Sequence, residues 1–415
     1  METKKRILVF VPEFPVLTET FIERELAKLV ERGNVDLTIF SLAKGSGVVS
    51  EILENKIVYD RLNIKDFFLS LPYIFSNLPR LRKIFLGFGT ETRGIESESA
   101  NDSKSSSPKK LYTFFKSILY SIKFSKYKPE FILAHFLSSP STIVMYASGI
   151  IGISYGISAH AKDIMVTGEF IKEKVQTSKF ITICNRNAYE YVLDKAKGLD
   201  TSTVFLKYHG VDVPKIIERF ENKDFIPEKP LILAIGRLVE KKGLIYLIEA
   251  ASFLKDKGLN FEINIIGSGP LYENLVEEIN SRNLQDEVNI LGENKGLSNE
   301  ETLLYLKSTK LFAFPSIETD EGDVDGVANV LMEAGVFKVP VVTTDAGGVG
   351  EIIVNEDTGL VVEQRNSSAL AEKIEYLLKN EEKSKRLGQN LHNKVLEKFD
   401  LNTNIIELEN LLLKN

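Results

Sequence analysis

The amino-acid sequence predicts an α/β protein made of two doubly wound, Rossmann-like domains, each with a parallel sheet. Short and almost continuously apolar runs alternate with stretches of helical periodicity along most of the chain. Such runs are typical of parallel strands that are buried on both faces. With 415 residues, 43% of them hydrophobic, the chain is long enough for two separate cores. We expect a first domain over 1–213, a linker over 214–229 and a second domain over 230–398.

In the first half, the strand Arg6–Val11 is followed by a loop over 12–20 and by a helix that ends at Gly33. Thr20 and Glu23 are suited to a capping box at the start of this helix. Ligands of doubly wound domains bind at the carboxyl ends of strands, so this loop is a candidate site, although it lacks a glycine-rich fingerprint. Further strands are expected at Val35–Phe40, Phe131–Ala134, Ile153–Ser158, Phe180–Ile183 and Val204–Leu206.

Residues 66–128 depart from this pattern. A stretch rich in Phe, Leu and Ile over 66–86 precedes a segment rich in Ser, Glu and Asn, for which we expect a mobile insertion over about 90–108. The basic and amphipathic segment 109–128 predicts a helix. Such a helix either lies on an anionic membrane surface or packs on the sheet with its lysines in solvent, and the sequence leaves both interpretations open.

Two of the four histidines, His135 and His160, follow predicted strands, where functional side chains are often placed. We interpret His135 as a histidine that bonds the backbone. His160, close to Asp163, is interpreted as functional. His209 and Asp212 are expected to serve the turn that closes the first domain.

The second half repeats the alternation and predicts a parallel sheet covered by helices on both faces. Its predicted strands are Leu231–Ile235, Phe261–Ile266, Val288–Leu291, Leu311–Phe314, Val339–Thr343 and Gly359–Val362. Its predicted helices are 243–257, 270–282, 298–307 and 327–337, followed by helices from Ser368 to Lys398. The remaining segment, 399–415, is expected to form a helix that packs back on the first domain.

The turn after the strand Leu231–Ile235 has the features of an anion-binding site. Gly236, Arg237, Lys242 and Gly243 lie between this strand and the next helix, so two cations and a helix N-terminus meet at one strand end. Arginine can bind a diphosphate through a fork of hydrogen bonds, and lysine adds a point charge. The turn is not a Walker loop, because Gly-x-x-x-x-Gly-Lys-Ser/Thr is absent.

The stretch from Glu318 to Gly335 places carboxylates at the mouth of a predicted helix. Asp325 stands where an N-cap is expected, and Gly326 allows close approach of the backbone. Glu333 follows Asp325 by eight residues, about two helical turns, so the two can share one side. Carboxylates repel phosphate but accept hydrogen bonds from paired hydroxyls. This pattern favours sugar binding, provided that cations elsewhere hold the phosphate.

Together these motifs resemble the retaining nucleotide-sugar glycosyltransferases of family 4, which have the GT-B fold of two Rossmann-like domains facing across a cleft. The matching pieces of the second half are Gly236-Arg237-Leu238…Lys242-Gly243, Ile266-Gly267-Ser-Gly-Pro270, Asp325…Glu333-Ala-Gly335, Gly347-Gly348…Glu351 and Asp357-Thr-Gly359. The pieces of the first half that resemble exopolysaccharide and colanic-acid-type members are Phe14-Pro15…Glu19-Thr20-Phe-Ile22, His135-Phe136 and Ser158-Ala-His160-Ala-Lys-Asp163-Ile164. The resemblance covers nearly the whole chain except 66–128.

The resemblance implies a role for each matched residue. Arg237 and Lys242 would hold the donor diphosphate and stabilise the leaving nucleotide, Asp325 would hold the sugar hydroxyls, and His160 would lie beside the transferred sugar. Further donor-binding residues implied are Gly236, Gly267, Gly326, Val327, Ala328, Asn329 and Glu333, the last at the ribose hydroxyls. The acceptor-side residues implied are Pro15, Glu19, Thr20, His135 and Asp163.

The implied reaction moves a sugar from a UDP- or GDP-sugar to a glycan or lipid-linked acceptor in the synthesis of bacterial surface or exopolysaccharides. A phosphate oxygen of the donor would take the acceptor proton on the donor's own face, so no protein nucleophile, metal or cofactor is expected. The chain departs from the family at Asp325, where glutamate is usual. This shorter carboxylate either keeps the hydrogen bonds after a small loop shift or alters the sugar preference.

Two alternatives stay open: a UDP-sugar 2-epimerase of the same fold, and a non-catalytic partner protein. A nicotinamide dehydrogenase is disfavoured because no Gly-x-Gly-x-x-Gly follows a strand. Asp323-Val-Asp325 is similar to a metal-binding Asp-x-Asp, but that motif belongs to another glycosyltransferase fold. An EF-hand loop fails, because position twelve counted from Glu321 is Met332.

Charge and targeting features suggest a cytoplasmic protein, either soluble or peripheral on the inner face of the cell membrane. Residues 1–214 carry 29 Lys and Arg against 23 Asp and Glu, a net +6, and the remainder carries −12. A basic first half suits phosphate-bearing partners or an anionic membrane surface, whereas the acidic total argues against nucleic acid. A single cysteine, Cys184, excludes an internal disulfide. Neither a signal-peptide core nor an apolar run of about 18 residues is present.

Overall fold

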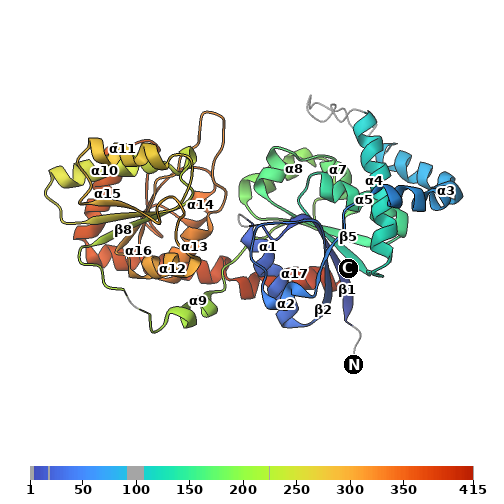
Figure 1. Cartoon of the computed structure of the whole chain (residues 1–415), viewed down its shortest axis with the longest axis horizontal. Coiled ribbons are helices and arrows are strands. Elements are labelled where there is room, and N and C mark those ends of the chain that lie inside the picture. The colour runs from blue at the N-terminus through green and yellow to red at the C-terminus, as the bar shows by residue number, and fades with distance from the viewer. Residues whose placement is uncertain (1–3, 17–18, 91–106, 224, 415) are drawn as a thin grey trace. The chain divides into compact units, whose positions relative to one another are not determined.

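The computed structural model describes residues 4–16, 19–90, 107–223 and 225–414. The chain forms two compact units (Figure 1): unit 1 consists of Met1–His209 with Asn402–Asn415, and unit 2 consists of Gly210–Leu401. No helix among the described residues is long and apolar enough to cross a membrane.

Unit 1 is built on a parallel seven-stranded sheet with the order β3-β2-β1-β4-β5-β6-β7. Its strands are β1 (Lys5–Phe14), β2 (Val35–Lys44), β3 (Ile57–Tyr59), β4 (Phe131–His135), β5 (Ser154–Ala159), β6 (Ile181–Ile183) and β7 (Val204–Leu206). Its helices are α1 (Thr20–Arg32), α2 (Glu51–Glu54), α3 (Ile64–Thr90), α4 (Ser107–Ser125), α5 (Ser139–Ile151), α6 (Ala161–Met165), α7 (Ile171–Thr177), α8 (Arg186–Lys195) and α17 (Leu401–Lys414).

Helices cover both faces of this sheet. One core contains the apolar side chains of α4 and α5, among them Phe114 and Tyr146. The other contains α1 together with the C-terminal helix α17, which contributes Ile405, Leu408 and Leu412. The last helix of the chain therefore packs on the sheet that begins near the N-terminus.

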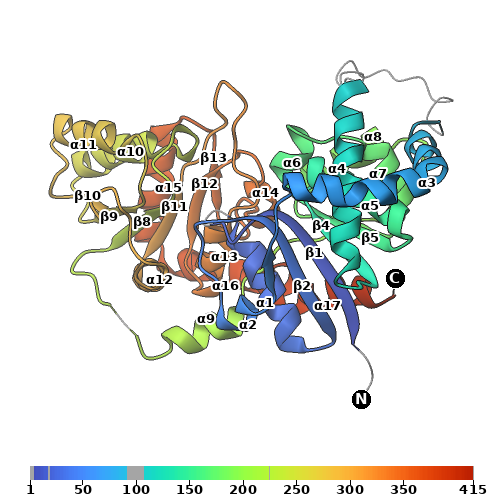
Figure 2. The same ribbon diagram turned by 45° about the vertical axis from the view of Figure 1, so that its right-hand side comes forward.

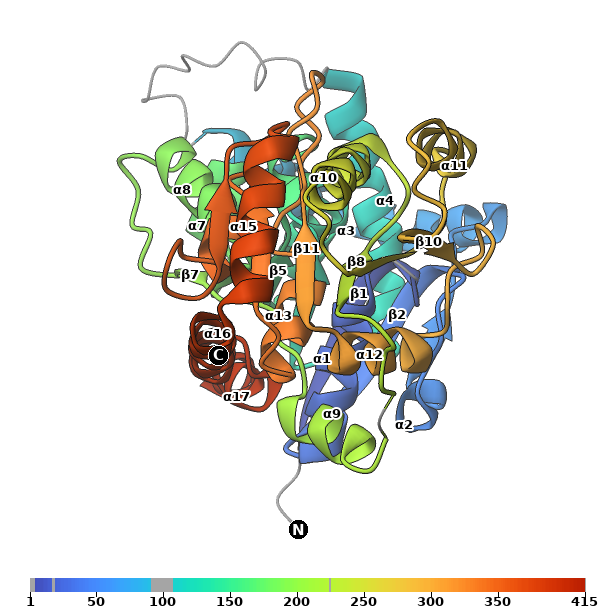
Figure 3. The ribbon, with the colours of Figure 1, turned by 90° about the vertical axis from the view of Figure 1, so that its left-hand side faces the viewer.

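Unit 2 is built on a parallel six-stranded sheet with the order β10-β9-β8-β11-β12-β13. Its strands are β8 (Leu231–Ile235), β9 (Glu262–Ile266), β10 (Val288–Leu291), β11 (Leu311–Phe314), β12 (Val341–Thr344) and β13 (Leu360–Val362). Its helices are α9 (Val213–Phe220), α10 (Leu244–Asp256), α11 (Tyr272–Ser281), α12 (Asn299–Ser308), α13 (Asn329–Val336), α14 (Val349–Ile352), α15 (Ser367–Lys379) and α16 (Glu381–Lys398). Helices α10 and α15 lie side by side on one face (Figure 3).

Each sheet contains one point at which the strand order reverses. In unit 1 it lies between β1 and β4, and in unit 2 between β8 and β11. The connections leave these two strands toward opposite faces of the sheet, so a crevice opens outside their carboxyl ends. The residues that follow β8 and β11, and those that follow β1 and β4, are therefore placed where ligands of doubly wound sheets bind.

Two local expectations are wrong, and a third concerns residues outside the described part of the chain. Thr20 and Glu23 form no capping box: α1 has Glu19 at its N-cap position with no side-chain cap, and Glu23 instead accepts a hydrogen bond from the Ser50 N–H at 3.0 Å. The expected linker over 214–229 begins with most of helix α9, whose N-cap side chain is Asp212. The expected mobile insertion falls largely on 91–106, outside the described residues.

The basic segment 109–128 packs in the core of unit 1 through α4, as one of the two interpretations has it. Phe114, Ile118 and Phe124 are buried. Lys123 is also buried, where it forms ion pairs with Asp60 and Asp66. The exposed apolar side chains of this region lie mainly on the neighbouring helix α3, which crosses α4 in Figure 2.

Candidate functional site

The turns after β8 and β9 lie next to each other beside the reversal point of the unit 2 sheet. Ile235 and Ile266 pair at the ends of these strands, so Gly236 and Gly267 follow in register. A Cβ on Gly267 would lie 1.9 Å from the Gly236 carbonyl oxygen, and a Cβ on Gly236 would lie 3.0 Å from Cε of Lys242. Gly267 therefore requires glycine, because any side chain there would displace the turn after β8, whereas a side chain at Gly236 would press on the flexible lysine.

Lys242 reaches from the turn after β8 to the loop after β11. Its Nζ lies 4.9 Å from the centre of the Phe314 ring and 2.6 Å from the Asp325 carboxylate. Both side chains of this pair are only 13% exposed. Lys241 lies 2.9 Å from Asp323 and 3.6 Å from Asp325. Two lysines and two aspartates thus face one another at the reversal point.

The backbone of Asp325 is held by the loop after β12. The Gly348 N–H donates to the Asp325 carbonyl at 3.0 Å. Gly347 has φ +55°, and a Cβ there would lie 2.2 Å from the same carbonyl oxygen. Similarly, a Cβ on Gly348 would lie 2.7 Å from the carbonyl carbon of Gly326. The Gly347-Gly348 pair of the sequence motif therefore makes room for the acidic loop.

Asp325 is not a helix cap, contrary to expectation. Helix α13 begins at Asn329, and its N-cap residue Ala328 supplies no side-chain acceptor. The Asp325 carboxylate is instead used by Lys242. Because Asp325 precedes the helix by four residues, the spacing to the half-buried Glu333 does not place the two on one helical side.

Arg237 is exposed, and no described residue offers its guanidinium a hydrogen bond or an ion pair. It is thus an available cation close to the paired Lys242. Val327, like Gly326 and Ala328, lies half-buried in the loop that leads into α13. This stretch supplies backbone N–H groups ahead of the first helical turn.

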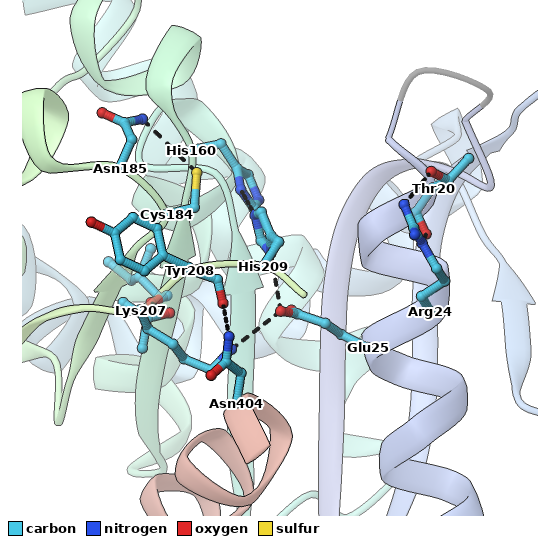
Figure 4. Close-up of polar contacts among 12 residues, drawn as sticks. Thr20, Arg24, Glu25, His160, Cys184, Asn185, Lys207, Tyr208, His209 and Asn404 are labelled. Atoms are coloured by element: carbon cyan, nitrogen blue, oxygen red, sulfur yellow. Dashed lines mark hydrogen bonds and ion pairs between the residues drawn. The ribbon is translucent and has the colours of Figure 1, made fainter. Parts of the chain in front are cut away.

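In unit 1, the strand ends near the reversal point carry a buried cluster of histidines (Figure 4). His209 Nδ1 lies 3.0 Å from Glu25 Oε1, and His209 Nε2 lies 3.0 Å from His160 Nδ1. Lys207 approaches the same Glu25 oxygen at 3.2 Å. The Phe21 ring stacks on His209, with ring centres 4.0 Å apart.

Two expectations about histidines are corrected by this cluster. His209 does not merely serve a turn, since it joins Glu25 to His160. His135 does not bond the backbone: neither ring nitrogen has a hydrogen-bond partner among the described residues, although both are buried. Its ring stacks near His160, with centres 5.8 Å apart, and burial together with the positive charges of His209 and Lys207 lowers its pKa to about 4 despite Glu25.

Asp163 holds the ends of β4 and β5 together. Its carboxylate accepts the backbone N–H groups of His160 and Leu137. Burial raises its pKa to about 7, against these hydrogen bonds. The buried Lys174 ammonium donates to the carbonyls of Leu137 and Ser138 at 2.8 and 2.9 Å. Asp163 and Lys174 therefore fix the loop that follows His135.

Of the expected acceptor-side residues, three lie around the end of β1. Pro15 is buried, and its carbonyl accepts from the Gly47 N–H at 3.0 Å. Glu19 is half-buried, and burial together with the charge of Glu13 raises its pKa. Thr20 is exposed, and its hydroxyl accepts from Arg24 at 3.1 Å.

Sequence reasoning missed Glu25, Lys207 and His209. One signal was present: Glu25 lies on the apolar face of α1 between Ile22 and Leu29 and is 2% exposed. A carboxylate at such a position requires a buried cation as partner. Nothing local, however, identified Lys207 and His209 as that partner across about 180 residues.

One group of side chains in the described part of the chain could hold a metal ion. Ligand atoms of His160, Cys184 and His209 lie within 4.8 Å of one another, and imidazole with thiolate is a ligand set that suits zinc. One nitrogen of each ring, Nδ1 of His160 and Nε2 of His209, already faces the other in a hydrogen bond. The geometry therefore fits either a metal or a purely hydrogen-bonded cluster.

The chain is similar to several known glycosyltransferases. CapM, a capsular polysaccharide biosynthesis glycosyltransferase of Staphylococcus aureus, is 29% identical over 256 residues, which are 60% of this chain and 61% of CapM. AmsK, an amylovoran biosynthesis glycosyltransferase of Erwinia amylovora, is 35% identical over 176 residues, 42% of each chain. The crystal structure of Anabaena HepE in complex with UDP aligns with 99% of this chain and 100% of HepE, with a TM-score of 0.66 and 15% identity.

The aligned part of the chain spans less than two thirds of the length of CapM and AmsK. The GT-B fold class is confirmed by the structural likeness, and so is the resemblance to exopolysaccharide glycosyltransferases. Assignment to family 4 stays a prediction. Residues 216–394 match the family model of glycosyl transferases group 1.

Proposed function

We propose that the protein is a retaining glycosyltransferase that moves a sugar from a nucleotide-diphosphate sugar to a glycan or lipid-linked acceptor in polysaccharide synthesis. The observation that carries this proposal is the Lys242–Asp325 pair at the reversal point of the unit 2 sheet. A cation for a diphosphate and a carboxylate for sugar hydroxyls meet there. The names of CapM and AmsK, both glycosyltransferases of polysaccharide synthesis, support the same reaction class.

In this proposal, Arg237 and Lys242 bind the donor diphosphate and stabilise the negative charge that develops on the leaving nucleotide. Lys242 exchanges part of its contact with Asp325 for phosphate oxygens, which leaves the carboxylate available to sugar hydroxyls. Glu333 accepts hydrogen bonds from the ribose. Because two side-chain cations supply the positive charge, no metal ion or cofactor is required. The acceptor hydroxyl bonds to the anomeric carbon on the face from which the nucleoside diphosphate leaves, and a phosphate oxygen takes the acceptor proton, so the transferred sugar keeps its anomeric configuration.

The first test is a thermal-shift screen of UDP, GDP, ADP and their common sugars. A ligand at about one hundred times its dissociation constant stabilises the folded protein by roughly 2.7 kcal/mol. We expect one nucleotide to raise the melting temperature of the wild type, and the double variant Arg237→Ala/Lys242→Ala to lose that increase. Lys257→Ala, which removes an exposed ion pair with Glu375 in the same unit, is the matched control and should keep it.

The outcomes separate the remaining alternatives. If the stabilising nucleotide sugar is consumed only when an acceptor is added, transfer is supported, and the anomeric configuration of the product then tests retention. Isomerisation of the sugar without any acceptor would indicate the UDP-sugar 2-epimerase. Absence of stabilisation by every nucleotide would contradict the proposal and favour a non-catalytic partner protein.

We also propose that unit 1 contacts an anionic membrane, on the cytoplasmic side, through α3. Five apolar residues of this helix recur at helical spacing on one face, and each is at least 47% exposed: Ile64, Phe68, Phe75, Leu78 and Leu86. Four exposed cations accompany them: Lys65, Arg80, Arg82 and Lys83. A helix that combines apolar and cationic surface can lie in the interface of an anionic bilayer. Within residues 66–128, the lipid contact would thus be made mainly by α3 and not by α4.

Flotation with liposomes checks the membrane proposal. We expect the wild type to float with vesicles that contain anionic phospholipid and to remain in the soluble fraction with neutral vesicles. Phe68→Ser/Phe75→Ser should abolish flotation, because it removes two large side chains from the exposed face. Ile406→Ser, which removes an exposed apolar residue of α17 in the same unit, should float like the wild type. Equal flotation of both variants would contradict a role of α3.

A further inference from the structure

The ends of three neighbouring strands of unit 1 carry side chains that can bind a metal ion. His160 follows β5, Cys184 follows β6 and His209 lies three residues after the end of β7. Ala159 and Ile183 pair at the ends of β5 and β6, so His160 and Cys184 leave the sheet as direct neighbours. The turn after β7 brings His209 toward both, and Figure 4 shows the three side chains grouped together.

The ligand atoms of these side chains are nearly as close as the ligands of one metal ion. They all lie within 4.8 Å of one another. Nδ1 of His160 lies 3.0 Å from Nε2 of His209, and the Cys184 thiol is also a hydrogen-bond partner of His209. Two nitrogens that bind a tetrahedral zinc ion are about 3.3 Å apart. An ion can therefore replace the hydrogen between the two rings after a small outward shift of the nitrogens.

The surrounding side chains hold these ligands in place. Oε1 of Glu25 lies 3.0 Å from Nδ1 of His209, and a carboxylate on the second nitrogen commonly orients a metal-binding histidine. The Asn185 amide lies 3.9 Å from the Cys184 sulfur, to which it donates. The Phe21 ring stacks on His209, with ring centres 4.0 Å apart. Little ordering of side chains is thus required when an ion binds.

Unpaired buried nitrogens also point to a ligand at this place. Nε2 of His160 and both ring nitrogens of His135 are buried and have no hydrogen-bond partner among the described residues. Such atoms are rare in native proteins, and they often mark an ion or an ordered water. The rings of His135 and His160 are stacked, with centres 5.8 Å apart. Cys184 is only partly buried, so an ion can reach the site at the cysteine.

We propose that His160, Cys184 and His209 bind a zinc ion that links the carboxyl ends of β5, β6 and β7, with a water molecule as the fourth ligand. Two imidazoles and a thiolate suit zinc, whereas magnesium and calcium prefer oxygen ligands. Without the ion, the hydrogen bond between the two histidines holds the same groups together. The diphosphate is assigned to Arg237 and Lys242 of unit 2, so the proposed sugar transfer still requires no metal ion.

Titration with cobalt(II), which replaces zinc and absorbs visible light, tests the ligand set directly. The full chain is purified without a polyhistidine tag and freed of metal with a chelator. We expect a single bound cobalt ion per chain, with the strong d–d bands of a tetrahedral ion and a sulfur-to-cobalt charge-transfer band. Added zinc should abolish both. The weak bands of an octahedral ion without any charge-transfer band would overturn the proposal.

Three variants identify the ligands. Cys184→Ser removes the single cysteine of the chain and should lose the charge-transfer band. His209→Gln should weaken zinc binding by at least about a hundredfold, because removal of a residue that only orients a ligand already costs about tenfold to a hundredfold. His392→Gln removes a histidine of unit 2 and should bind both ions like the wild type. Zinc binding of unchanged affinity in Cys184→Ser or His209→Gln would contradict the proposal.

Zinc should also stabilise the folded chain. An ion that binds the folded protein and not the unfolded chain raises the melting temperature. We expect this increase in the wild type and in His392→Gln, its reversal by a chelator, and its loss in Cys184→Ser. An equal increase in the wild type and in Cys184→Ser would show unspecific binding and overturn the site. Because none of these measurements uses a nucleotide or an acceptor, failure of the metal site and failure of the proposed function are distinguishable.

Discussion

Replacing Lys242 with methionine is expected to lower kcat for glycosyl transfer by at least about a hundredfold, the usual effect of removing one preorganised group that stabilises developing negative charge. The lysine side chain lies over Gly236 and the Phe314 ring and is 13% exposed. It is therefore held in place before the donor arrives. Methionine keeps most of the apolar contact but provides no charge. Steady-state kinetics with the nucleotide sugar found in the thermal-shift screen measures the effect.

The neighbouring Lys241 provides a matched control. It belongs to the same turn, is 11% exposed and pairs mainly with Asp323 at 2.9 Å. Lys241→Met should therefore lower kcat far less than Lys242→Met. In Asp325→Asn, Lys242 loses its carboxylate partner, so the variant should bind the free nucleoside diphosphate at least as tightly as the wild type while transfer falls. Similar kinetic losses at Lys241 and Lys242 would contradict the assignment of the diphosphate to Lys242.

The strands of unit 2 could be predicted closely from the sequence, and the reason is physical. β8, β10 and β11 coincide with the expected ranges, because a strand buried on both faces must be apolar throughout and ends where polar or glycine residues begin. The close backbone approach at Gly267 was also predicted, since close approach of two turns leaves a glycine in the sequence. Strand ranges and turn glycines can thus be predicted from the local sequence, because they depend mainly on the residues of one segment.

Features that depend on a distant partner were predicted poorly. Asp325 has the local signature of a helix cap, but its carboxylate is bound by Lys242, 83 residues away. Glu23 likewise is used by the Ser50 N–H. A short polar side chain can accept a hydrogen bond from a nearby backbone N–H or from a donor far away in the sequence. The local sequence pattern predicts only the nearby partner. His209 was missed for the same reason, since its partners Glu25 and His160 lie on other strands and helices.

The exposed face of α3 illustrates a different limit. The sequence showed that 66–128 combines apolar and basic residues, but 109–128 carries the more obvious amphipathic pattern. In the structure, the Lys123 ammonium is paired with Asp60 and Asp66 inside unit 1. The apolar surface that stays exposed is on α3. Which of two adjacent amphipathic helices covers the sheet depends on packing that periodicity alone does not specify.

Replacing Glu25 with glutamine is expected to have the largest effect on stability, about 3–5 kcal/mol near pH 6, as for other buried ion pairs that lose one partner. Glu25 is 2% exposed and is the shared acceptor of Lys207 and His209. The amide is almost the same size, so packing is retained while both cations lose their counter-charge. Urea unfolding of the variant and the wild type across a range of pH measures the difference. Glu130→Gln, which breaks an exposed ion pair with Arg6, should cost less than about 1 kcal/mol.

The pH dependence of this loss follows from the two shifted groups. The pKa of His209 is raised from 6.5 to about 9 in the folded protein, so its pairing with Glu25 stabilises fully below pH 6.5 and is lost as pH rises through 9. The pKa of Glu25 is lowered from 4.5, so its contribution is fully present above pH 4.5 and is lost on further acidification. The cost of Glu25→Gln should therefore be greatest between pH 4.5 and 6.5 and should shrink toward pH 9, where only Lys207 remains charged beside the site. A loss that stayed constant from pH 6 to 9 would show that His209 is not an imidazolium in the native protein.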